Sequence, residues 1–478
     1  MNNKPNIHLF RTRGASYFYD ANTAAIVKIS DSLYDALLNE KEPTLKEDIE
    51  YKEKLISKGY LSSFRPKEIV HPSTDIVEDI LENNVEMITL QLTQQCNFRC
   101  AYCPYTIASE DRGHSAKRMT FEMAKKGVDF LLTHSANVKD PVIGFYGGEP
   151  FLEFDLIKKV IEYTKKKAGG KFFGFTVTTN GSLLTEDKVQ FLEENSVIVM
   201  ISLDGPKEVH DKNRKLAVSG KGSFEKVMDN VMRLYDAHPS FVKNNIQFNA
   251  VVDPVNQFSC FNEFFIKAEY IKNSSMLRTQ ILESKYTDYS DPTAVEFFME
   301  REQEIFKMFL AKMGRLSEEK ISPLVKMQYE EMINKLHLGR RTMLSLPEYG
   351  HPSGPCVPGS ARVFLSCDGT LLPCEKVSEK TDAFKIGTID EGFDFDLVRK
   401  ILNIGKLTEE ACKNCWAFTM CVSCANGCDD GSELSAQKRL ADCQDVKGYL
   451  DEAFVHYCTL KELGCNYAAY GFNDPVEL

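Results

Sequence analysis

The sequence of 478 residues lacks the features that would place a protein in a membrane or on a nucleic acid. No apolar run approaches the length of a membrane-spanning helix, and residues 1–8 lack the hydrophobic stretch of a signal peptide. Lys and Arg total 58 against 69 Asp and Glu, so the net charge of -11 offers no general basic footprint for a polyanion. We therefore expect a cytoplasmic protein that binds neither membrane nor nucleic acid.

The chain also lacks internal repeats and the composition of a disordered protein. Apolar residues make up 43% and charged residues 27%, which is ordinary for a globular protein. At about 100 to 200 residues per domain, the length predicts about two to four domains.

Cysteine is unusually abundant, with fifteen residues in two dense groups. Three lie within Cys96–Cys103 and nine within Cys356–Cys443, whereas Cys260, Cys458 and Cys465 stand apart. In a reducing compartment such clustering indicates metal or cluster ligands rather than disulfides. The three isolated thiols are expected to be small buried hydrophobic residues.

The first 80 residues predict a separate small unit in which strands precede helices. Its expected strands are Ile7–Phe10, Tyr17–Asp20 and Ala25–Ile29, and its expected helices are Ser32–Leu38 and Leu45–Lys58. The apolar faces expected of these helices comprise Leu33, Leu37 and Leu38, and Ile49, Leu55 and Ile56.

Residues 86–284 alternate buried strands with helices, which predicts an α/β fold with a parallel sheet or partial barrel. The expected strands are Met87–Leu92, Val142–Tyr146, Phe172–Thr178, Val197–Leu203, Ile246–Val252 and Leu277–Leu282. Residues 285–350 are expected to form a helical bridge, with helices at Glu296–Met313 and Ser317–Leu336, before the cysteine-rich residues 351–478. Reactive groups belong at the carboxyl ends of the parallel strands.

A Cys-x3-Cys-x2-Cys loop follows the first of these strands, with ligands at Cys96, Cys100 and Cys103. Three thiolates in eight residues can hold three corners of a cubane and leave its fourth iron open for a small molecule. A closed zinc site with His114 as the fourth ligand is the alternative.

Polar motifs follow three further strands, at Gly147–Pro150, Thr179–Gly181 and Ser202–Gly205. Each motif alone would be an ordinary turn. Their place on successive strands above a three-cysteine loop predicts a common ligand site.

Together these motifs make residues 86–284 resemble the radical S-adenosylmethionine (SAM) superfamily, with a partial (β/α)6 barrel. In that family a cluster bound by the three cysteines cleaves SAM to a 5'-deoxyadenosyl radical, using an external flavodoxin or ferredoxin as electron donor. The resemblance implies that Tyr102 is the aromatic residue before the last cysteine. It also implies that Gly148 and Glu149 meet the methionyl amine, Asn180 and Ser202 the ribose or carboxylate, and Arg214 the carboxylate. Arg214 could instead be a solvated surface cation.

The second cysteine field resembles the SPASM extension of peptide-modifying and sulfatase-activating members of the superfamily. It runs Cys356-x12-Gly369-x4-Cys374 and then Cys412-x2-Cys415-x5-Cys421-x2-Cys424, followed by Cys428 and Cys443. The resemblance implies two auxiliary clusters, hence three [4Fe-4S] clusters in all. One would use Cys412, Cys415, Cys421 and Cys443, and the other Cys356 and Cys374 with Cys424 or Cys428, and Cys367 as a possible further ligand.

The auxiliary sites differ from the family pattern at one step. The gap after Cys421 is x2 rather than the usual x3, which leaves open whether the second auxiliary cluster keeps a free iron. A zinc ribbon built from the two Cys-x2-Cys pairs is the alternative.

The order of strands and helices in residues 1–80 resembles the small winged-helix modules that bind leader segments of ribosomally made peptides. A leader would add to an exposed strand edge beside a helix. A helical lid or a dimerisation module is the alternative.

These resemblances indicate a radical SAM peptide maturase that forms Cys thioether crosslinks in a precursor peptide. The alternatives are an anaerobic sulfatase maturase that makes formylglycine and a non-enzymatic iron-sulfur or zinc scaffold. Glu375, which follows Cys374 where sulfatase maturases usually carry Asp, is the candidate base or supporting residue, or a plain surface carboxylate.

Overall fold

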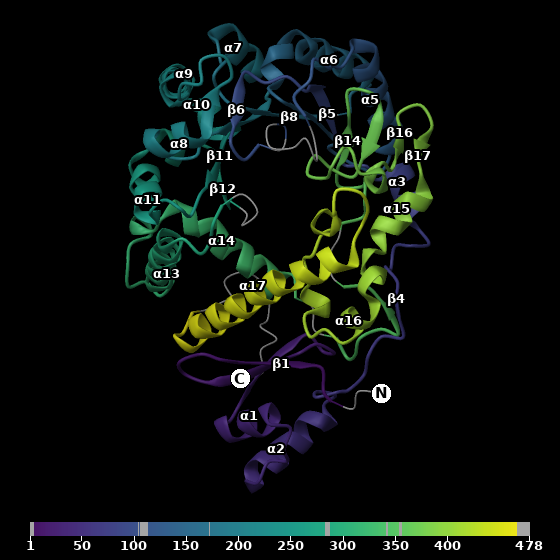
Figure 1. Cartoon of the computed structure of the whole chain (residues 1–478), viewed down its shortest axis with the longest axis vertical. Helices are drawn as coiled ribbons and strands as arrows, with labels where there is room; N and C mark the ends of the chain where they lie inside the picture. Colours follow the sequence, from purple (N-terminus) through teal and green to yellow (C-terminus); the bar gives the residue numbers. More distant parts are fainter. Residues whose placement is uncertain are drawn as a thin grey trace.

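The fold is organised around one sheet of ten strands (Figure 1). A computed structural model describes residues 4–103, 105, 113–171, 173–282, 287–340, 343–352 and 356–465. In sheet order the strands are β12 (Met276–Ile281), β11 (Ile246–Val252), β9 (Ile198–Ser202), β8 (Gly174–Thr179), β7 (Val142–Gly147), β5 (Met87–Thr93), β14 (Val363–Leu365), β15 (Thr370–Leu372), β16 (Gly387–Thr388) and β17 (Gly392–Phe393).

Six strands, from β12 to β5, are parallel, which confirms the expected α/β sheet with a partial-barrel arrangement. Their core is apolar because helices cover a parallel sheet: Ile88, Val177, Val199 and Phe248 are all buried. One expected residue, Phe172, lies outside the described residues. The helices of this region are α5 (Phe121–His134), α6 (Phe154–Lys167), α7 (Glu186–Glu194), α8 (Lys207–Asn213), α9 (Phe224–Ala237), α10 (Pro239–Asn245), α11 (Phe258–Lys267) and α12 (Glu269–Lys272).

The cysteine-rich segment contributes the other four strands of the same sheet. Val363, Phe364 and Leu365 of β14 pair in parallel with Ile88, Thr89 and Leu90 of β5. β15, β16 and β17 continue the sheet in antiparallel fashion. The loop between β14 and β15 therefore lies beside the carboxyl end of β5, an arrangement that the sequence did not predict.

Two long helices lie outside the sheet: α17 (Ala436–Glu462) runs diagonally across the lower half of the molecule in Figure 1, and α13 (Pro292–Lys312) lies at the left side of that view. The expected helix at residues 317–336 is interrupted. It consists of a 3-10 turn (Glu318–Lys320), α14 (Pro323–Ile333) and a π-helical turn (Asn334–Leu338). Proline at the first position of α14 explains the break, because its fixed φ suits the start of a helix.

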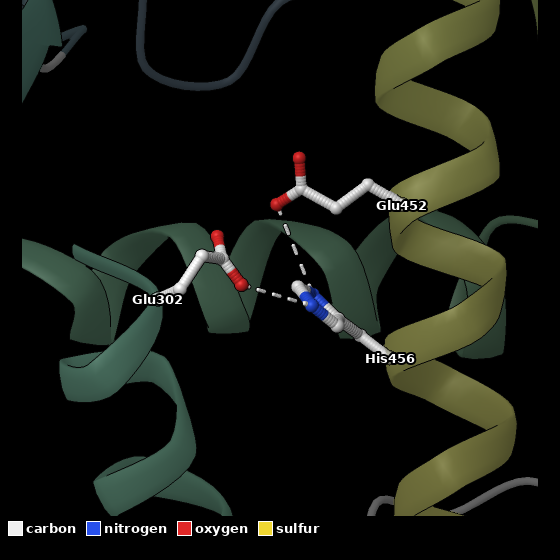
Figure 2. Close-up of side chains that lie close together, drawn as sticks. All are labelled: Glu302, Glu452 and His456. Atoms are coloured by element: carbon white, nitrogen blue, oxygen red, sulfur yellow. Dashed lines mark ion pairs between the residues drawn. The ribbon is translucent and has the colours of Figure 1, made fainter. Parts of the chain in front are cut away.

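An ion-pair network joins α13 to α17 (Figure 2). His456 Nε2 lies 3.5 Å from Glu302 Oε2, and His456 Nδ1 lies 3.9 Å from Glu452 Oε1. Arg301 Nη1 lies 2.9 Å from Glu302 and 3.5 Å from Glu452, so a cation of the protein already balances the two carboxylates. This network fixes how the helical bridge sits against α17.

The N-terminal residues form a separate antiparallel sheet, with β1 (Ile7–Arg11), β2 (Ser16–Asp20) and β3 (Ala25–Ile29), followed by α1 (Asp31–Leu38) and α2 (Lys46–Ser57). The expected strands and helices are confirmed. The expected apolar faces are only partly buried: Leu33 and Leu55 are in the core, whereas Leu38 is 57% and Ile56 53% exposed.

This sheet packs against α17 and the second cysteine field, at the lower end of the molecule in Figure 1. Phe10 and Tyr19 stack on Phe454 of α17. His8 stacks on Trp416, the residue after Cys415, with ring centroids 3.9 Å apart. The N-terminal unit thus contacts a predicted cluster loop directly.

The remaining elements connect these parts, and they are α3 (Val77–Asn83), the paired strands β4 (Glu68–Ile69) and β13 (Tyr349–Gly350), α15 (Phe395–Leu402) and α16 (Glu409–Lys413). Within the ranges given above, no helix is long and apolar enough to cross a membrane.

Candidate functional site

The three-cysteine loop is held at the carboxyl end of β5 by a short ribbon. β6 (Phe98–Cys100) pairs antiparallel with β10 (Arg214–Leu216), and Arg214 lies directly opposite Cys100. The ribbon explains how a residue more than a hundred positions later reaches the loop.

Burial controls the chemistry of these thiols. It raises the pKa of Cys96 to about 12, with a further contribution from Glu149. It also raises the pKa of Cys100 to about 12, although Arg214 acts in the opposite direction. Both thiols therefore stay protonated at neutral pH until a metal displaces the proton, as cluster ligands do.

His114 does not join the cysteines. Its Nδ1 lies 3.2 Å from the carbonyl oxygen of Gln94, and its ring is tilted against Tyr105. Among the described residues, no group of three cysteine, histidine or carboxylate ligands close enough for one ion includes His114. The geometry does not support the closed zinc site.

The two glycines after β7 allow the chain to approach the cysteine loop. A Cβ on Gly147 would lie 2.2 Å from the Thr93 carbonyl oxygen, and one on Gly148 would lie 2.0 Å from that of Gln95. The amide of Gly148 donates to Thr93 O at 2.8 Å, which leaves no room for a side chain. These glycines are required by backbone packing against the loop that leads to Cys96.

Glu149 has a structural task that the sequence did not reveal. Its buried carboxylate accepts hydrogen bonds from Thr179 Oγ1 at 2.7 Å, the Asn180 amide at 2.8 Å and the Phe151 amide at 3.0 Å. Burial raises the pKa of Glu149, while these donors lower it. Because both carboxylate oxygens are engaged, Glu149 ties the end of β7 to the end of β8.

Asn180 lies beside Cys96 at the end of β8. Its Nδ2 is 2.8 Å from Asn97 Oδ1 and 3.9 Å from Cys96 Sγ, and its Oδ1 accepts from Ser182 Oγ at 2.6 Å. Ser202 is the last residue of β9, one strand further along the sheet, and it is 9% exposed. Gly148, Glu149 and Asn180 therefore meet at the cysteine loop, with Ser202 at the neighbouring strand end.

Arg214 is a buried ion-pair partner and not a solvated surface cation. Its Nε donates to Asp204 Oδ2 at 2.9 Å, with side chains 8% and 0% exposed. Tyr102 donates its hydroxyl hydrogen bond to the same carboxylate oxygen and lies under the guanidinium, 5.5 Å from ring centroid to Cζ. Burial would lower the pKa of Arg214, but Asp204 and then Tyr102 and Cys100 keep it well above its usual value. Its charge is thus fixed beside the cysteine loop.

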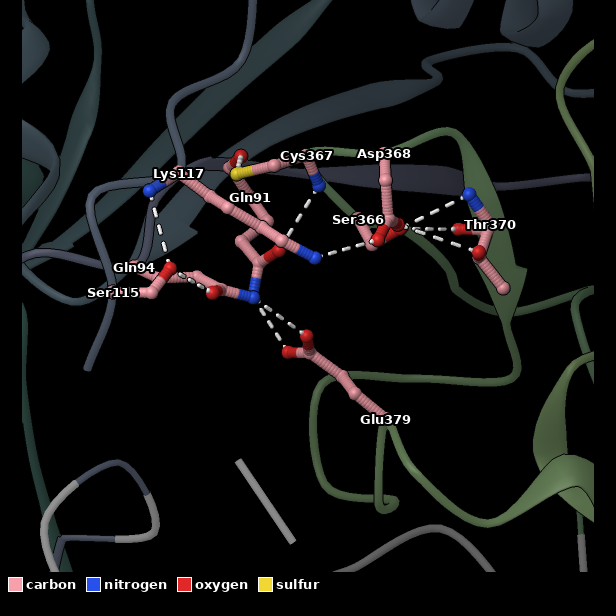
Figure 3. Close-up of polar contacts among 9 residues, drawn as sticks. All are labelled: Gln91, Gln94, Ser115, Lys117, Ser366, Cys367, Asp368, Thr370 and Glu379. Carbon is pink, nitrogen blue, oxygen red and sulfur yellow. Dashed lines mark hydrogen bonds and ion pairs between the residues drawn. The ribbon is translucent and has the colours of Figure 1, made fainter. Parts of the chain in front are cut away.

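A second carboxylate, Glu379, reaches the carboxyl end of β5 (Figure 3). Gln91 Nε2 donates to its Oε1 at 2.6 Å, and Gln94 Nε2 donates to its Oε2 at 3.1 Å. Gln91 also accepts from the amide of Cys367 at 3.0 Å. No sequence signal marks Glu379, because only the β14–β5 pairing brings its loop to this place.

Cys367 belongs to this network and not to the other cysteines. Its Sγ donates to the carbonyl oxygen of Gln91 at 3.0 Å. Burial raises its pKa to about 12, with Glu379 and Asp368 as the next contributors. The geometry assigns Cys367 no place among the cluster cysteines.

Glu375 lies among the auxiliary cysteines. It is ion-paired with Arg362, its side chain is 15% exposed, and its other oxygen is buried without a hydrogen-bond partner in the described part of the chain. Burial alone would lower the pKa of Arg362. Glu375, and then Cys374 and Cys356, raise this pKa above its usual value. Glu375 is therefore not a plain surface carboxylate.

The auxiliary cysteines fall into two groups of electrostatic neighbours. Burial and then Cys424 raise the pKa of Cys356, and burial, Glu375 and Cys424 raise that of Cys374 to about 11. The other set is Cys415, Cys421 and Cys443. Burial is the largest cause that raises the pKa of each of these thiols, and Cys412 contributes to each shift. Cys428 is fully buried; its Sγ lies 3.8 Å from Arg439 Nη1 and 3.6 Å from the carbonyl oxygen of Cys424, so it lies between the first group and this arginine.

The spacing of these thiols fits clusters better than single metal ions. Tetrahedral zinc with Zn–S bonds of about 2.3 Å would bring its sulfurs within about 4 Å of one another. In the described residues, no three cysteine sulfurs lie within 4.8 Å of one another. A cubane binds each cysteine at a different iron and so keeps the sulfurs further apart.

Comparisons with known proteins agree with this geometry. Residues 90–248 match the model of the radical SAM superfamily. The chain is 26% identical over 391 residues to a cysteine-type anaerobic sulfatase-maturating enzyme of Clostridium novyi, covering 77% of this chain and 95% of that protein. Over 158 residues it is 31% identical to the antilisterial bacteriocin subtilosin biosynthesis protein AlbA of Bacillus subtilis, covering 32% of this chain and 31% of that protein. The fold is similar to native anSMEcpe with bound AdoMet and Kp18Cys peptide, with a TM-score of 0.57, 21% identity and coverage of 79% and 99%.

Proposed function

Because this chain is a radical SAM enzyme, we propose that it forms thioether crosslinks between cysteine and a carbon of another residue in a ribosomally made precursor peptide. The observation that carries the proposal is the trio Cys356, Cys374 and Cys424, which are electrostatic neighbours, whereas Cys428, also a neighbour of Cys424, lies against Arg439. Three thiols can hold three corners of a cluster and leave the fourth for a substrate thiol.

The proposal assigns residues to each cofactor, and the contacts at the cysteine loop support the first of these assignments. Cys96, Cys100 and Cys103 would hold the SAM-binding cluster, and SAM would lie along Gly148, Asn180 and Ser202. Cys412, Cys415, Cys421 and Cys443 would hold one auxiliary cluster, and the trio would hold the other. When bound, these groups supply hydrogen-atom abstraction and take up one electron, so a peptide that gives up one hydrogen atom, one proton and one electron gains a C–S bond.

Residues of the protein position the groups that take part in this reaction. Asp204 fixes the charge of Arg214 beside Cys100, and Glu149 locks the two strand ends that flank Cys96. Glu149 accepts three hydrogen bonds within the protein, so the backbone at residues 148–149 is the group that we expect to meet a methionyl amine. Glu375 and Arg362 supply an ion pair next to Cys374 where the substrate thiol would approach.

The same proposal assigns a peptide-binding role to residues 1–80. Leu38, Ile49 and Ile56 leave apolar surface exposed on α1 and α2, and β3 is an edge strand of the N-terminal sheet. A leader segment can add to such an edge and place apolar side chains on the neighbouring helices. A flavodoxin or ferredoxin would deliver the electron.

Formylglycine formation is the second candidate, because the relative of Clostridium novyi that covers 77% of this chain is a sulfatase-maturating enzyme. Against this candidate, sulfatase maturases usually carry Asp at the position after Cys374, where this chain has Glu375. The two reactions share the radical step and differ in whether a thiol sulfur is kept in the product.

Mass spectrometry of the product decides between them. The reconstituted enzyme is incubated anaerobically with SAM, a reductant and a candidate precursor peptide that contains cysteine. A thioether removes two hydrogens per crosslink, blocks thiol alkylation and disappears when the acceptor cysteine is alanine. Formylglycine, a carbon-carbon link with free thiols, or inverted stereochemistry at unchanged mass would each reject the thioether.

A further inference from the structure

Arg439 is the largest side chain that the fold buries completely, with 1% of the residue exposed. It lies in the first turn of α17. Its Nε donates to Thr408 Oγ1 at 3.1 Å, and its Nη1 lies 3.3 Å from Ser423 Oγ and 3.8 Å from Cys428 Sγ. All of these partners are uncharged groups or a thiol.

No carboxylate of the described residues lies within ion-pair distance of Arg439, in contrast to buried Arg214, which is paired with Asp204. Burying a guanidinium without an anion is strongly unfavourable. A further buried arginine, Arg340, donates to the backbone carbonyls of Leu336 and Ala24, which carry partial negative charge. Arg439 has only the hydroxyl oxygens of Thr408 and Ser423 and the Cys428 thiol as hydrogen-bond acceptors in the described part of the chain, and these groups are weaker partners for a guanidinium than an anion.

The surroundings of Arg439 indicate which anion is missing. Thr408 Oγ1 contacts both Arg439 and Cys412 Sγ, the latter at 3.3 Å. Burial would lower the pKa of Arg439, whereas Cys428, Cys412 and Cys421 raise it. Arg439 thus lies where the set containing Cys412 and Cys421 meets Cys428, four residues after Cys424.

A second buried cation, Lys335, lies on the π-helical turn, which packs against α17. Lys335 Nζ is buried and has no hydrogen-bond partner in the described part of the chain. It lies 5.1 Å from the ring centroid of Tyr449. Burial lowers its pKa to about 8, and Cys421 is the group that opposes this shift.

We propose that Arg439, with Lys335 as a second cation, supplies the counter-charge of the auxiliary cluster held by Cys412, Cys415, Cys421 and Cys443 and raises its reduction potential. A cubane bound by four thiolates is a net anion, and nearby positive charge favours its reduced state. Both are positioning residues that act through the cluster. The inference rests on the proposed function, because it requires that cluster to be present.

The test uses a full-length protein in which Cys96, Cys100 and Cys103 are alanine, so that only auxiliary clusters are observed. Anaerobically reconstituted protein is titrated potentiometrically and followed by electron paramagnetic resonance. Arg439→Met removes the charge while keeping an unbranched side chain. Arg439→Lys keeps the charge, and Arg399→Met removes an arginine from the partly exposed ion pair with Glu78 as the matched control.

The expected result is that Arg439→Met and Lys335→Met each keep their iron and lower the potential of one and the same cluster. For Arg439→Met we expect at least a tenfold change in the reduced-to-oxidised ratio, which is 59 mV for a one-electron couple. Arg439→Lys and Arg399→Met should leave the potential near that of the parent. Unchanged potentials in Arg439→Met, or an equal drop in Arg439→Lys, would overturn the proposal.

If Arg439→Met loses iron, Lys335→Met and Arg439→Lys decide the question. The charge effect is then rejected if Lys335→Met leaves the reduction potential unchanged. It is also rejected if Arg439→Lys lowers the potential as far as Lys335→Met does. Failure of the proposed function looks different, because the parent protein itself would hold no auxiliary iron or would make no thioether.

Discussion

Arg214 and Cys100 face each other across the β6–β10 ribbon, as directly opposed residues of its register. This pairing fixes a buried guanidinium beside a thiol that a cluster would need as a thiolate. The partner that makes it possible is Asp204, which accepts from Arg214 Nε and also from the amide of Val251 at 3.1 Å.

Replacing Asp204 by Asn should therefore destabilise the protein. Breaking a buried ion pair leaves an uncompensated charge and costs about 3 to 5 kcal/mol. Chemical denaturation of the apoprotein measures the loss. The control is Asp382→Asn, which removes an exposed partner of Lys385 and should have little effect. Equal stability of Asp204→Asn and the parent would show that Arg214 does not depend on Asp204.

Iron content tests the number of clusters. Three [4Fe-4S] clusters predict about twelve irons per chain after anaerobic reconstitution, and about eight when Cys96, Cys100 and Cys103 are alanine. The triple variant should also lose reductive SAM cleavage. Zinc as the main metal of anaerobically purified protein would contradict the cluster assignment.

Cys424 and Cys428 should behave differently. Cys424 neighbours Cys356 and Cys374, whereas Cys428 faces Arg439. We expect Cys424→Ala to lose about four irons and Cys428→Ala to keep them. Iron analysis beside circular dichroism separates ligand loss from unfolding. The reverse pattern would assign Cys428 to the cluster.

Peptide binding should depend on the exposed apolar residues of α1 and α2. Leu38→Gln combined with Ile56→Gln should weaken precursor binding about tenfold or more, because each side chain loses apolar contact area. Both are more than half exposed, so stability should change little. Fluorescence anisotropy of a labelled precursor measures the affinity. Val218→Gln, at an exposed apolar residue in the barrel region, is the control. Unchanged affinity in the double variant would place the leader elsewhere.

His238 should make a pH-dependent contribution to stability. Its ring nitrogens lie 2.8 Å from Glu186 and 2.6 Å from Glu193, and these carboxylates raise its pKa although burial lowers it. A pKa raised in the folded state stabilises the protein fully below the unfolded value of about 6.5 and loses this effect as pH rises through the folded value. His238→Gln should therefore be destabilised at pH 6, by about 1 kcal/mol at most, and much less at pH 9. Thermal unfolding at the two pH values tests this, and equal losses at both would contradict it.

The parallel strands could be predicted from sequence because some, such as Ile198–Ser202, are nearly continuous apolar runs, and others, such as Ile246–Val252, alternate apolar with polar residues. Right-handed crossovers explain why consecutive strands are neighbours in the sheet, as are Val142–Gly147, Gly174–Thr179 and Ile198–Ser202. The cysteine spacings likewise identify the loop at Cys96 and the second field, because cluster ligands recur at fixed intervals.

Long-range relationships could not be predicted. The pairing of Val363 with Ile88 depends on backbone register, which no local pattern encodes. Glu379 enters the site only through that pairing. The choice between Cys424 and Cys428 depends on which way a short turn points, and the burial of Arg439 within its polar helix depends on tertiary packing.

The pairing of β14 with β5 also has a consequence for synthesis on the ribosome. β5 begins at Met87, but its outer neighbour begins only at Val363. At 5 to 20 residues per second, this edge of the nascent sheet stays uncovered for roughly tens of seconds. An unpaired strand edge is a template for pairing with other chains. Slow or crowded translation should therefore favour aggregation through β5, and a chaperone that covers this edge should improve the yield of folded protein.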